Sequence, residues 1–256
     1  TAGTPVVFAL LIGPGVSLML DGNQVFFSAL LTRLYSGMNS FPLMAVPFFI
    51  LAGELMNQGG ITQSIVRFSQ TLIGHYRGGL AQVNILSSVL FAGLSGSAVA
   101  DTSALGKMLI PAMEENGYSR RFAAAVTAAS SVIGPIIPPS GIMILYAFIM
   151  NVSVAGMFLA GITPGLLICA GLMIVTSRIS KKRNYPVANK KATWYERGSA
   201  FKKSFLPLLT PVILLGGIVL GVFTPTEAAA AAAGYALIIT LFVTNTLKFD
   251  KLPHIL

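Results

Sequence analysis

Two polar interruptions in an apolar chain hold the side chains best suited to binding an ion or an organic acid. The first is "GLSGSAVADTSALGK" (Gly93–Lys107), with Ser95, Ser97 and Asp101, one of only 8 acidic residues. Asp101 follows Ser97 by four positions, which places both on one face of a helix. The second is "GPIIPPSG" (Gly134–Gly141), where proline rings remove amide donors and block helical hydrogen bonds. Carbonyl groups in this stretch are therefore left without helical partners.

Hard oxygen atoms from both interruptions suit a dehydrated Na⁺. Ser95 and Ser97 offer hydroxyls, and three residues of the second stretch, Gly134, Ile137 and Pro139, offer carbonyls. Paired half-helix ends near the bilayer midplane are the recurring ion and substrate site of secondary transporters. A carboxylate at membrane depth is by default functional. Asp101 would offset the charge of Na⁺ or accept hydrogen bonds from substrate hydroxyls.

Structural roles for the same residues stay open. Asp101 would also stabilise a helix N-terminus through the helix dipole. Ser95 and Ser97 are small enough for close helix packing, and the prolines would by themselves produce a kink. A proton site at Asp101 or Glu54 is the alternative to Na⁺ coupling. A non-transporting scaffold subunit is a third interpretation.

The composition indicates a membrane protein. Hydrophobic residues make up 54% of the 256 residues, charged residues only 10%, and the mean hydropathy is +0.78. A soluble domain carries about 25% charged residues. One cysteine and two histidines exclude a disulfide framework and most cysteine or histidine metal sites. No P-loop, HExxH or GxSxG motif is present, and no nucleophile–base pair supports an enzyme.

The net charge of +9 is concentrated in one segment between two apolar runs. Nine of the 17 basic residues lie within Arg178–Lys203, where only Glu196 opposes them. This pattern is typical of a cytoplasmic loop that follows the positive-inside rule. The segment has few aromatic side chains on which bases would stack, so no nucleic-acid partner is expected.

Apolar runs on either side of the interruptions are candidate membrane spans. They are Thr4–Leu20, Phe41–Asn57, Ile61–Gly74, Val152–Ser177, Phe205–Phe223 and Thr226–Thr246. Asp21–Ser40 has apolar residues at helical spacing and predicts an interfacial amphipathic helix. Basic residues bracket the first interruption, so we predict a re-entrant hairpin over 82–113 that enters and leaves on the cytoplasmic side. A broken membrane helix over 119–150 follows.

Two segments hint at an internal repeat. "FPLMAVPFFILAGELM" (Phe41–Met56) and "FTPTEAAAAAAGYALI" (Phe223–Ile238) each have proline near the start and contain one Glu and one Gly. If they are equivalent, a second hairpin and a second broken helix should follow Leu256.

Several long motifs resemble the large membrane subunit of TRAP transporters, the tripartite ATP-independent periplasmic systems. They are "GLSGSAVADTSALGKMLIPAM", "GYSRRFAAAVTAASSVIGPIIPPS", "AGITPGLL", "TPTEAAA", "VPFFILAGELM" and "GHYRGGLAQVN". The resemblance covers almost the whole chain. It implies an all-α polytopic membrane protein of the elevator type, with two inverted repeats that each contain a re-entrant hairpin and a broken helix. The implied function is Na⁺-coupled import of organic acids, with sialic acid or a related sugar acid favoured over C4-dicarboxylates.

The resemblance also implies site residues and partners. The first Na⁺ site falls on Ser95, Ser97, Gly134, Ile137 and Pro139, and the substrate would lie near Ser97, Asp101 and Ser140. The implied partners are a small four-helix membrane subunit and a periplasmic substrate-binding protein, in the bacterial inner membrane. Family members continue through a second hairpin, which bears the other sodium site and an arginine for the substrate carboxylate.

We therefore expect the first repeat and the start of a second. Scaffold helices are expected in 1–80 and a transport domain in 81–177. A basic cytoplasmic loop is expected in 178–204 and an incomplete second repeat in 205–256.

Overall fold

The computed structural model describes residues 6–20, 29, 32–33, 35–37, 39, 42–187, 191–244 and 247. Over these residues the chain is helical, and the only β-structure is an isolated bridge between Arg77 and Val187. The predicted all-α class is therefore confirmed. The first helix, α1, covers Val6–Leu20. Most of the segment predicted as an amphipathic interfacial helix, Asp21–Ser40, lies outside the described residues.

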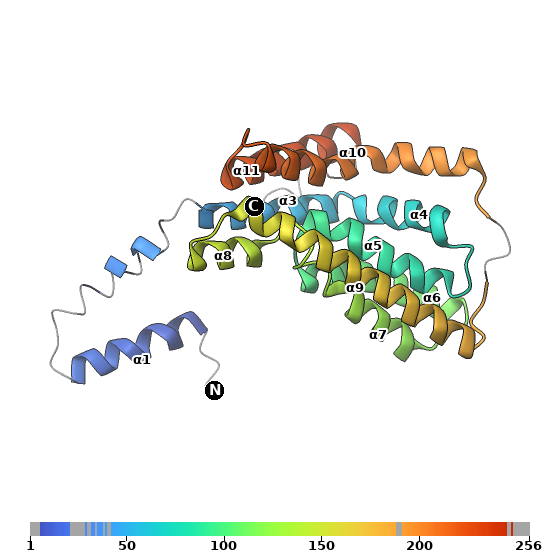
Figure 1. Cartoon of the computed structure of the whole chain (residues 1–256), viewed down its shortest axis with the longest axis horizontal. Helices are drawn as coiled ribbons and strands as arrows, with labels where there is room; N and C mark the ends of the chain where they lie inside the picture. Colours follow the sequence, from blue (N-terminus) through green and yellow to red (C-terminus); the bar gives the residue numbers. More distant parts are fainter. Residues whose placement is uncertain are drawn as a thin grey trace.

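The next two helices are shorter than the spans predicted for them. A 3₁₀ turn, η1 (Pro42–Met44), leads into α3 (Ala45–Gln58), and α4 covers Ile61–Ile73. These helices have 14 and 13 residues, whereas a membrane crossing needs about 20. Gly60, with a φ of 70°, separates them, and they follow one another along the same side of the molecule (Figure 1). Neither is long enough to cross a bilayer alone.

Both interruptions fall where glycine and proline predicted them. α5 (Gly79–Ser95) and α6 (Ala98–Glu115) form a helical hairpin that turns at Gly96 and Ser97. α7 (Arg120–Ser131) and α8 (Gly141–Met150) lie on either side of the second interruption. α7 packs against both α5 and α6. Because the chain reverses between them, α5 starts and α6 ends at the same end of the molecule (Figure 1).

Among the described residues, three long helical segments qualify by length and composition as candidate membrane spans. They are α9 (Val154–Lys182), α10 (Trp194–Val219), and α11 (Pro225–Ile238) with the π-helical turn η2 (Ile239–Val243) that continues it. α9 has 29 residues and is about 43 Å long at 1.5 Å per residue.

The basic segment is only partly a loop. α9 continues to Lys182, and α10 begins at Trp194, so only residues 183–193 separate the two helices. The segment predicted as a cytoplasmic loop, 178–204, is therefore helical at both ends, and its side of the membrane stays a prediction. α10 begins early because Thr193 and Glu196 form a capping box that satisfies its first amide groups. The same device, made by Thr224 and Glu227, begins α11.

Large apolar side chains on α8, α9 and α10 are exposed. Ile149, Leu167 and Val212 have 68%, 68% and 62% of their surfaces accessible. A soluble protein rarely leaves so many neighbouring apolar side chains in water. With the three candidate spans, these surfaces indicate a multi-pass membrane protein.

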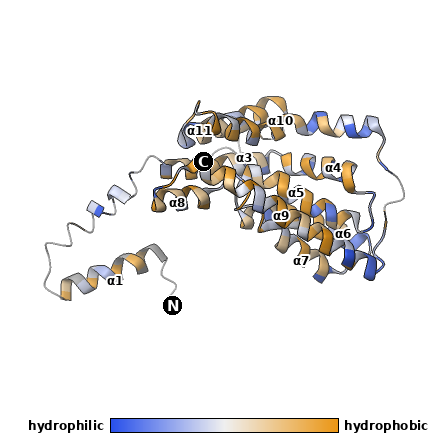
Figure 2. Ribbon diagram, in the orientation of Figure 1, coloured by the Kyte–Doolittle hydropathy of each residue, from blue (hydrophilic) through white to orange (hydrophobic). Residues whose placement is uncertain are grey.

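Hydrophilic residues gather at the end of the helical body where α6, α7 and α9 meet (Figure 2). There Tyr118 stacks on Tyr185 with ring centroids 4.6 Å apart, and the Tyr185 and Ser119 hydroxyls are 3.2 Å apart. Burial raises the pKa of Tyr118 to about 12, because the charged phenolate is disfavoured away from water. These contacts join the loop between α6 and α7 to the end of α9.

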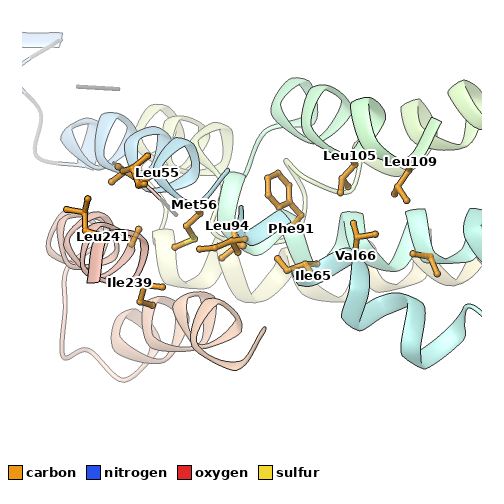
Figure 3. Close-up of a cluster of buried hydrophobic side chains, with 14 residues drawn as sticks. Leu55, Met56, Ile65, Val66, Phe91, Leu94, Leu105, Leu109, Ile239 and Leu241 are labelled. Carbon is orange, nitrogen blue, oxygen red and sulfur yellow. The ribbon is translucent and has the colours of Figure 1, made fainter. Parts of the chain in front are cut away.

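A continuous apolar core connects the hairpin to the flanking helices. Phe91 and Leu94 of α5 pack with Leu105 and Leu109 of α6 on one side (Figure 3). The same cluster includes side chains of α3, α4 and the end of α11, namely Leu55, Met56, Ile65, Val66, Ile239 and Leu241. The position of the hairpin tip is therefore set by packing along the whole length of α5.

The two segments suspected of being repeat equivalents, in α3 and α11, lie side by side in the same direction. Ala45, Phe49 and Ala52 cluster near the helix starts with four alanines of α11, namely Ala228, Ala229, Ala232 and Ala233. Leu55 and Met56 cluster with Ala236 near the ends. Inverted repeats reverse the direction of equivalent helices relative to the membrane. The pairing of Phe41–Met56 with Phe223–Ile238 as inverted equivalents is therefore wrong. The small alanine side chains instead allow the two helices to approach closely.

Candidate functional site

The tip of the hairpin is a glycine turn followed by a serine cap. α5 ends because Gly96 adopts the left-handed conformation, with φ of 57°, and its amide bonds back to the Ala92 carbonyl at 3.0 Å. α6 begins at Ser97, whose hydroxyl accepts a hydrogen bond from the Ala100 amide at 3.3 Å. The sequence Ser-Gly-Ser thus reverses the chain in two residues.

The break between α7 and α8 leaves several backbone oxygens free. In the described part of the chain, no hydrogen bond is accepted by the carbonyls of Gly134, Ile137 or Pro139. α8 then begins at Ser140, whose hydroxyl accepts a hydrogen bond from the Met143 amide at 3.4 Å. Ser97 and Ser140 have nearly the same backbone conformation, with φ of −133° and −135°. Both interruptions therefore end in the same serine cap.

The two interruptions are in direct contact. A Cβ atom placed on Gly96 would lie 2.5 Å from the Pro139 carbonyl oxygen and 3.1 Å from the Ser140 Cα. A Cβ on Gly134 would lie 2.8 Å from Asp101 Oδ2 and 3.2 Å from the Ser97 carbonyl carbon. The two interruptions, about 40 residues apart in the sequence, thus form one site.

Asp101 is the only carboxylate among the predicted site residues and is fully buried. Ser95 donates a short hydrogen bond to Asp101 Oδ1, and the Ser97 amide donates to the Ser95 hydroxyl at 3.3 Å. Asp101 Oδ2 has no hydrogen-bond partner among the described residues. Asp101 also lies in the first turn of α6, where the helix dipole stabilises negative charge. Oδ1 is therefore held by Ser95, and Oδ2 is available to a cation or a hydrogen-bond donor.

Two helix N-termini meet at the site. α6 starts beside Gly96 and α8 starts beside Pro139, and the two helices extend from this point toward opposite ends of the molecule (Figure 1). Each N-terminus carries a partial positive charge, equivalent to about half an elementary charge, and unsatisfied amides. A pair of them facing one region is suited to an anion such as a carboxylate.

Comparison with known proteins identifies the family. The model for "Tripartite ATP-independent periplasmic transporter, DctM component" matches residues 1–256. The chain belongs to this family.

Curated TRAP relatives match nearly the whole chain. The chain is 47% identical over 250 residues to the sialic acid TRAP transporter permease protein SiaT of Haemophilus influenzae, covering 98% of the chain and 40% of the relative. It is 45% identical over 256 residues to the sialic acid large permease protein SiaM of Vibrio cholerae, covering 100% and 59%. The C4-dicarboxylate large permease protein DctM of Vibrio cholerae is 40% identical over 246 residues, covering 94% and 53%.

The TRAP chain therefore belongs to a family of transport proteins, not enzymes. It spans about half the length of the curated relatives that it matches. The relatives carry names for different acids. The family is fixed by these matches, whereas the substrate is not.

A row of buried polar side chains between α5 and α7, which we call the seam, was not predicted from the sequence. On α5 and α7, Asn84 donates to the Thr127 hydroxyl at 2.7 Å, and Ser88 donates to the Ser130 hydroxyl at 2.9 Å. Nearer the tip, the Thr102 and Ser131 hydroxyls are 2.7 Å apart. The signal was present in the sequence, because Asn84 and Ser88 are four residues apart in an apolar helix and therefore share a face.

The seam aligns the two arms that carry the site. Asn84, Ser88 and Ser130 are buried, so their mutual hydrogen bonds replace those that water would make. The register of α5 against α7 then fixes how far Gly96 and Gly134 reach toward one another. All seven predicted ion and substrate positions lie at the two interruptions that this register brings together.

Proposed function

We propose that this chain forms part of the transport subunit of a Na⁺-coupled importer of organic acids. The observation that carries the proposal is the contact of Gly96 with Pro139 and Ser140, which brings together two helix N-termini, free carbonyls and Asp101. Discontinuous helices whose ends meet near the middle of the membrane are the usual site architecture of secondary transporters. Membership of the TRAP family supports the same reading.

Na⁺ is proposed to bind at Ser95, Ser97, Gly134, Ile137 and Pro139. The three carbonyls accept no hydrogen bond in the described residues. The Ser97 hydroxyl accepts one hydrogen bond, from Ala100, and the Ser95 hydroxyl accepts one, from the Ser97 amide, so each keeps a lone pair. The donor set is made of hard oxygens, as Na⁺ requires, and Asp101 Oδ2 supplies a nearby negative charge.

The substrate carboxylate is proposed to lie near Ser97 and Ser140, at the N-termini of α6 and α8. Asp101 would accept hydrogen bonds from substrate hydroxyls. Sialic acid or a related sugar acid is the favoured substrate, because the two relatives named for sialic acid share 47% and 45% identity with the chain, whereas the dicarboxylate relative of Vibrio cholerae shares 40%. A C4-dicarboxylate is the next candidate.

The subunit is proposed to work in the bacterial inner membrane with a small four-helix membrane subunit and a periplasmic substrate-binding protein. Na⁺ would order the two interruptions, and the ordered site would then admit the acid. Residues 81–177 would move as one body against the remaining helices, in an elevator mechanism built on inverted repeats. The shared core of α5, α6, α7 and α9 supports movement of this region as a unit.

Proton coupling at Asp101 is a second candidate. A fully buried carboxyl group with one oxygen unpartnered among the described residues is a suitable proton site. Glu54 fits this role less well, because its carboxylate is partly exposed and accepts a hydrogen bond from Gln58 at 2.7 Å.

Uptake of labelled sialic acid into proteoliposomes tests the proposal. The vesicles would contain the full-length subunit with its small membrane partner, and the binding protein would be added outside. Uptake that requires an inward Na⁺ gradient and that Ser97→Ala weakens supports the site. Uptake driven by a pH gradient without Na⁺ supports proton coupling, and uptake absent under every gradient supports a scaffold role.

A further inference from the structure

A second polar region lies away from the transport site, between α4 and the start of α10. It is a cavity of about 840 Å³. One wall is the polar face of α4 and the other is the first turns of α10 with the residues before it. The Ser204 hydroxyl donates to the Ser64 carbonyl at 2.9 Å and so joins the two walls.

The lining of this cavity carries a net positive charge. Arg67, Lys191 and Lys203 line it, together with His75, and the only acidic residue in the lining is Glu196. The Glu196 carboxylate already accepts hydrogen bonds from the Thr193 amide at 2.7 Å and the Thr193 hydroxyl at 3.0 Å. Within the part of the chain that the structure describes, none of the three cations forms an ion pair. They are therefore available to an anion from outside the chain.

Aromatic side chains beside the cavity indicate where that anion would lie. Trp194 and Tyr195, at the start of α10, are 86% and 85% exposed. Exposed Trp and Tyr are typical of the level of lipid headgroups in a bilayer. About two and three helical turns further along α10, Phe201 and Phe205 are 46% and 44% exposed. A cationic cavity thus opens beside a surface that continues into an apolar membrane span.

We propose that this cavity binds the phosphate headgroup of an anionic phospholipid, with an acyl chain lying along α10. Arg67, Lys191 and Lys203 would donate charge-assisted hydrogen bonds to the phosphate oxygens. Basic pockets between membrane helices suit anionic lipid headgroups. The bound lipid would stabilise the contact between α4 and α10, in addition to the hydrogen bond from Ser204 to Ser64. This site is separate from the ion and substrate site and does not depend on transport.

Lipid retention tests the proposal on the purified full-length protein. Native mass spectrometry would compare phosphatidylglycerol with phosphatidylethanolamine, and soluble glycerol phosphate would form a third arm. The test variant is Arg67→Gln with Lys203→Gln. The matched control is Lys181→Gln with Lys182→Gln, which removes two exposed cations from the end of α9, outside the cavity lining. We expect preferential retention of phosphatidylglycerol, reduced about tenfold in the test variant and little changed in the control.

Three outcomes overturn the proposal. Equal retention of the two lipids excludes a site for anionic headgroups. An equal loss in the test and control variants indicates attraction by the general basic surface. Binding of glycerol phosphate as strong as that of phosphatidylglycerol identifies a soluble anion as the ligand. If the test variant does not fold, Arg67→Lys with Lys203→Arg keeps both charges, and a loss of lipid preference in that folded variant contradicts a simple charge-based site.

Discussion

Gly96 and Pro139 are in backbone contact, so that a Cβ atom on Gly96 would lie 2.5 Å from the Pro139 carbonyl oxygen. Gly96 ends the first arm of the hairpin, and Pro139 lies just before the start of α8. Their contact is the point where the two interruptions meet. Both the left-handed φ of 57° and the lack of space require glycine at this position.

Gly96→Ala is expected to lower stability and abolish uptake. The left-handed backbone costs an alanine about 1–2 kcal/mol, and the methyl group must displace the Pro139 backbone, which adds about 1–3 kcal/mol. Thermal unfolding in detergent and proteoliposome uptake measure the two effects. Gly117→Ala is the matched control, because Gly117 also has a positive φ, of 84°, but no atom lies within 4 Å of its Cβ position. The control should lose about 1–2 kcal/mol and keep its transport activity. Equal uptake by both variants would show that the contact is not needed.

Gly134→Ala is expected to disturb the ion site by displacing Asp101. Its Cβ would lie 2.8 Å from Asp101 Oδ2 and 3.1 Å from the Ser131 carbonyl oxygen, so Asp101 must move. We expect the Na⁺ concentration for half-maximal uptake to rise at least about tenfold, as loss of one charge-assisted contact would produce. Gly106→Ala, in the middle of α6, is the control, because its Cβ would make only ordinary contacts, at 3.5 Å and 3.6 Å. An unchanged Na⁺ dependence in Gly134→Ala would show that the position of Asp101 does not affect Na⁺ binding.

The positions of the two interruptions could be predicted because their causes are local. Gly96 and the prolines between Gly134 and Gly141 end helices by their own backbone geometry, whatever surrounds them. The serines follow as caps for the same local reason. The serine hydroxyls and the free carbonyls could therefore be predicted from the sequence without knowledge of the fold.

The failures of prediction came from packing and from helix ends. The charge pattern of Arg178–Lys203 does not show how much of the segment is helical, because basic side chains are compatible with helix when a capping box, as at Thr193 and Glu196, starts it. Proline position and composition paired the segments in α3 and α11, although neither reveals the direction in which two helices pack. The contact of Gly96 with Pro139 joins residues more than 40 positions apart and depends on the register of the whole of α5.

Thr127→Val is expected to destabilise the seam between α5 and α7. The substitution leaves the buried Asn84 side chain without the hydrogen bond that it donates to Thr127, and Asn84 Oδ1 already lacks a partner among the described residues. The expected loss is about 1–3 kcal/mol in the free energy of unfolding. Thr240→Val is the control, because Thr240 is equally buried but bonds only to carbonyls of its own helix. Chemical unfolding followed by far-ultraviolet circular dichroism compares the two, and equal losses would contradict a special role for the seam.

Asp101→Asn separates the charge of Asp101 from its hydrogen bond. Asparagine keeps an oxygen that accepts from Ser95 but removes the negative charge beside the proposed Na⁺ ligands. If the carboxylate balances Na⁺, we expect uptake at physiological Na⁺ to fall at least about a hundredfold, since a lost buried charge interaction is worth several kcal/mol, while the protein remains folded.

Glu54→Gln is the matched control for Asp101→Asn, because Glu54 bonds only to Gln58 on the surface of its own helix. The Glu54→Gln variant should transport normally. A loss of uptake in this variant would instead identify Glu54 as the coupling residue. Normal Na⁺-dependent uptake by Asp101→Asn would show that Asp101 only stabilises the N-terminus of α6 through the helix dipole. Uptake that stays rapid but no longer responds to a pH gradient would instead identify Asp101 as a proton carrier, because only a titratable group can couple to protons.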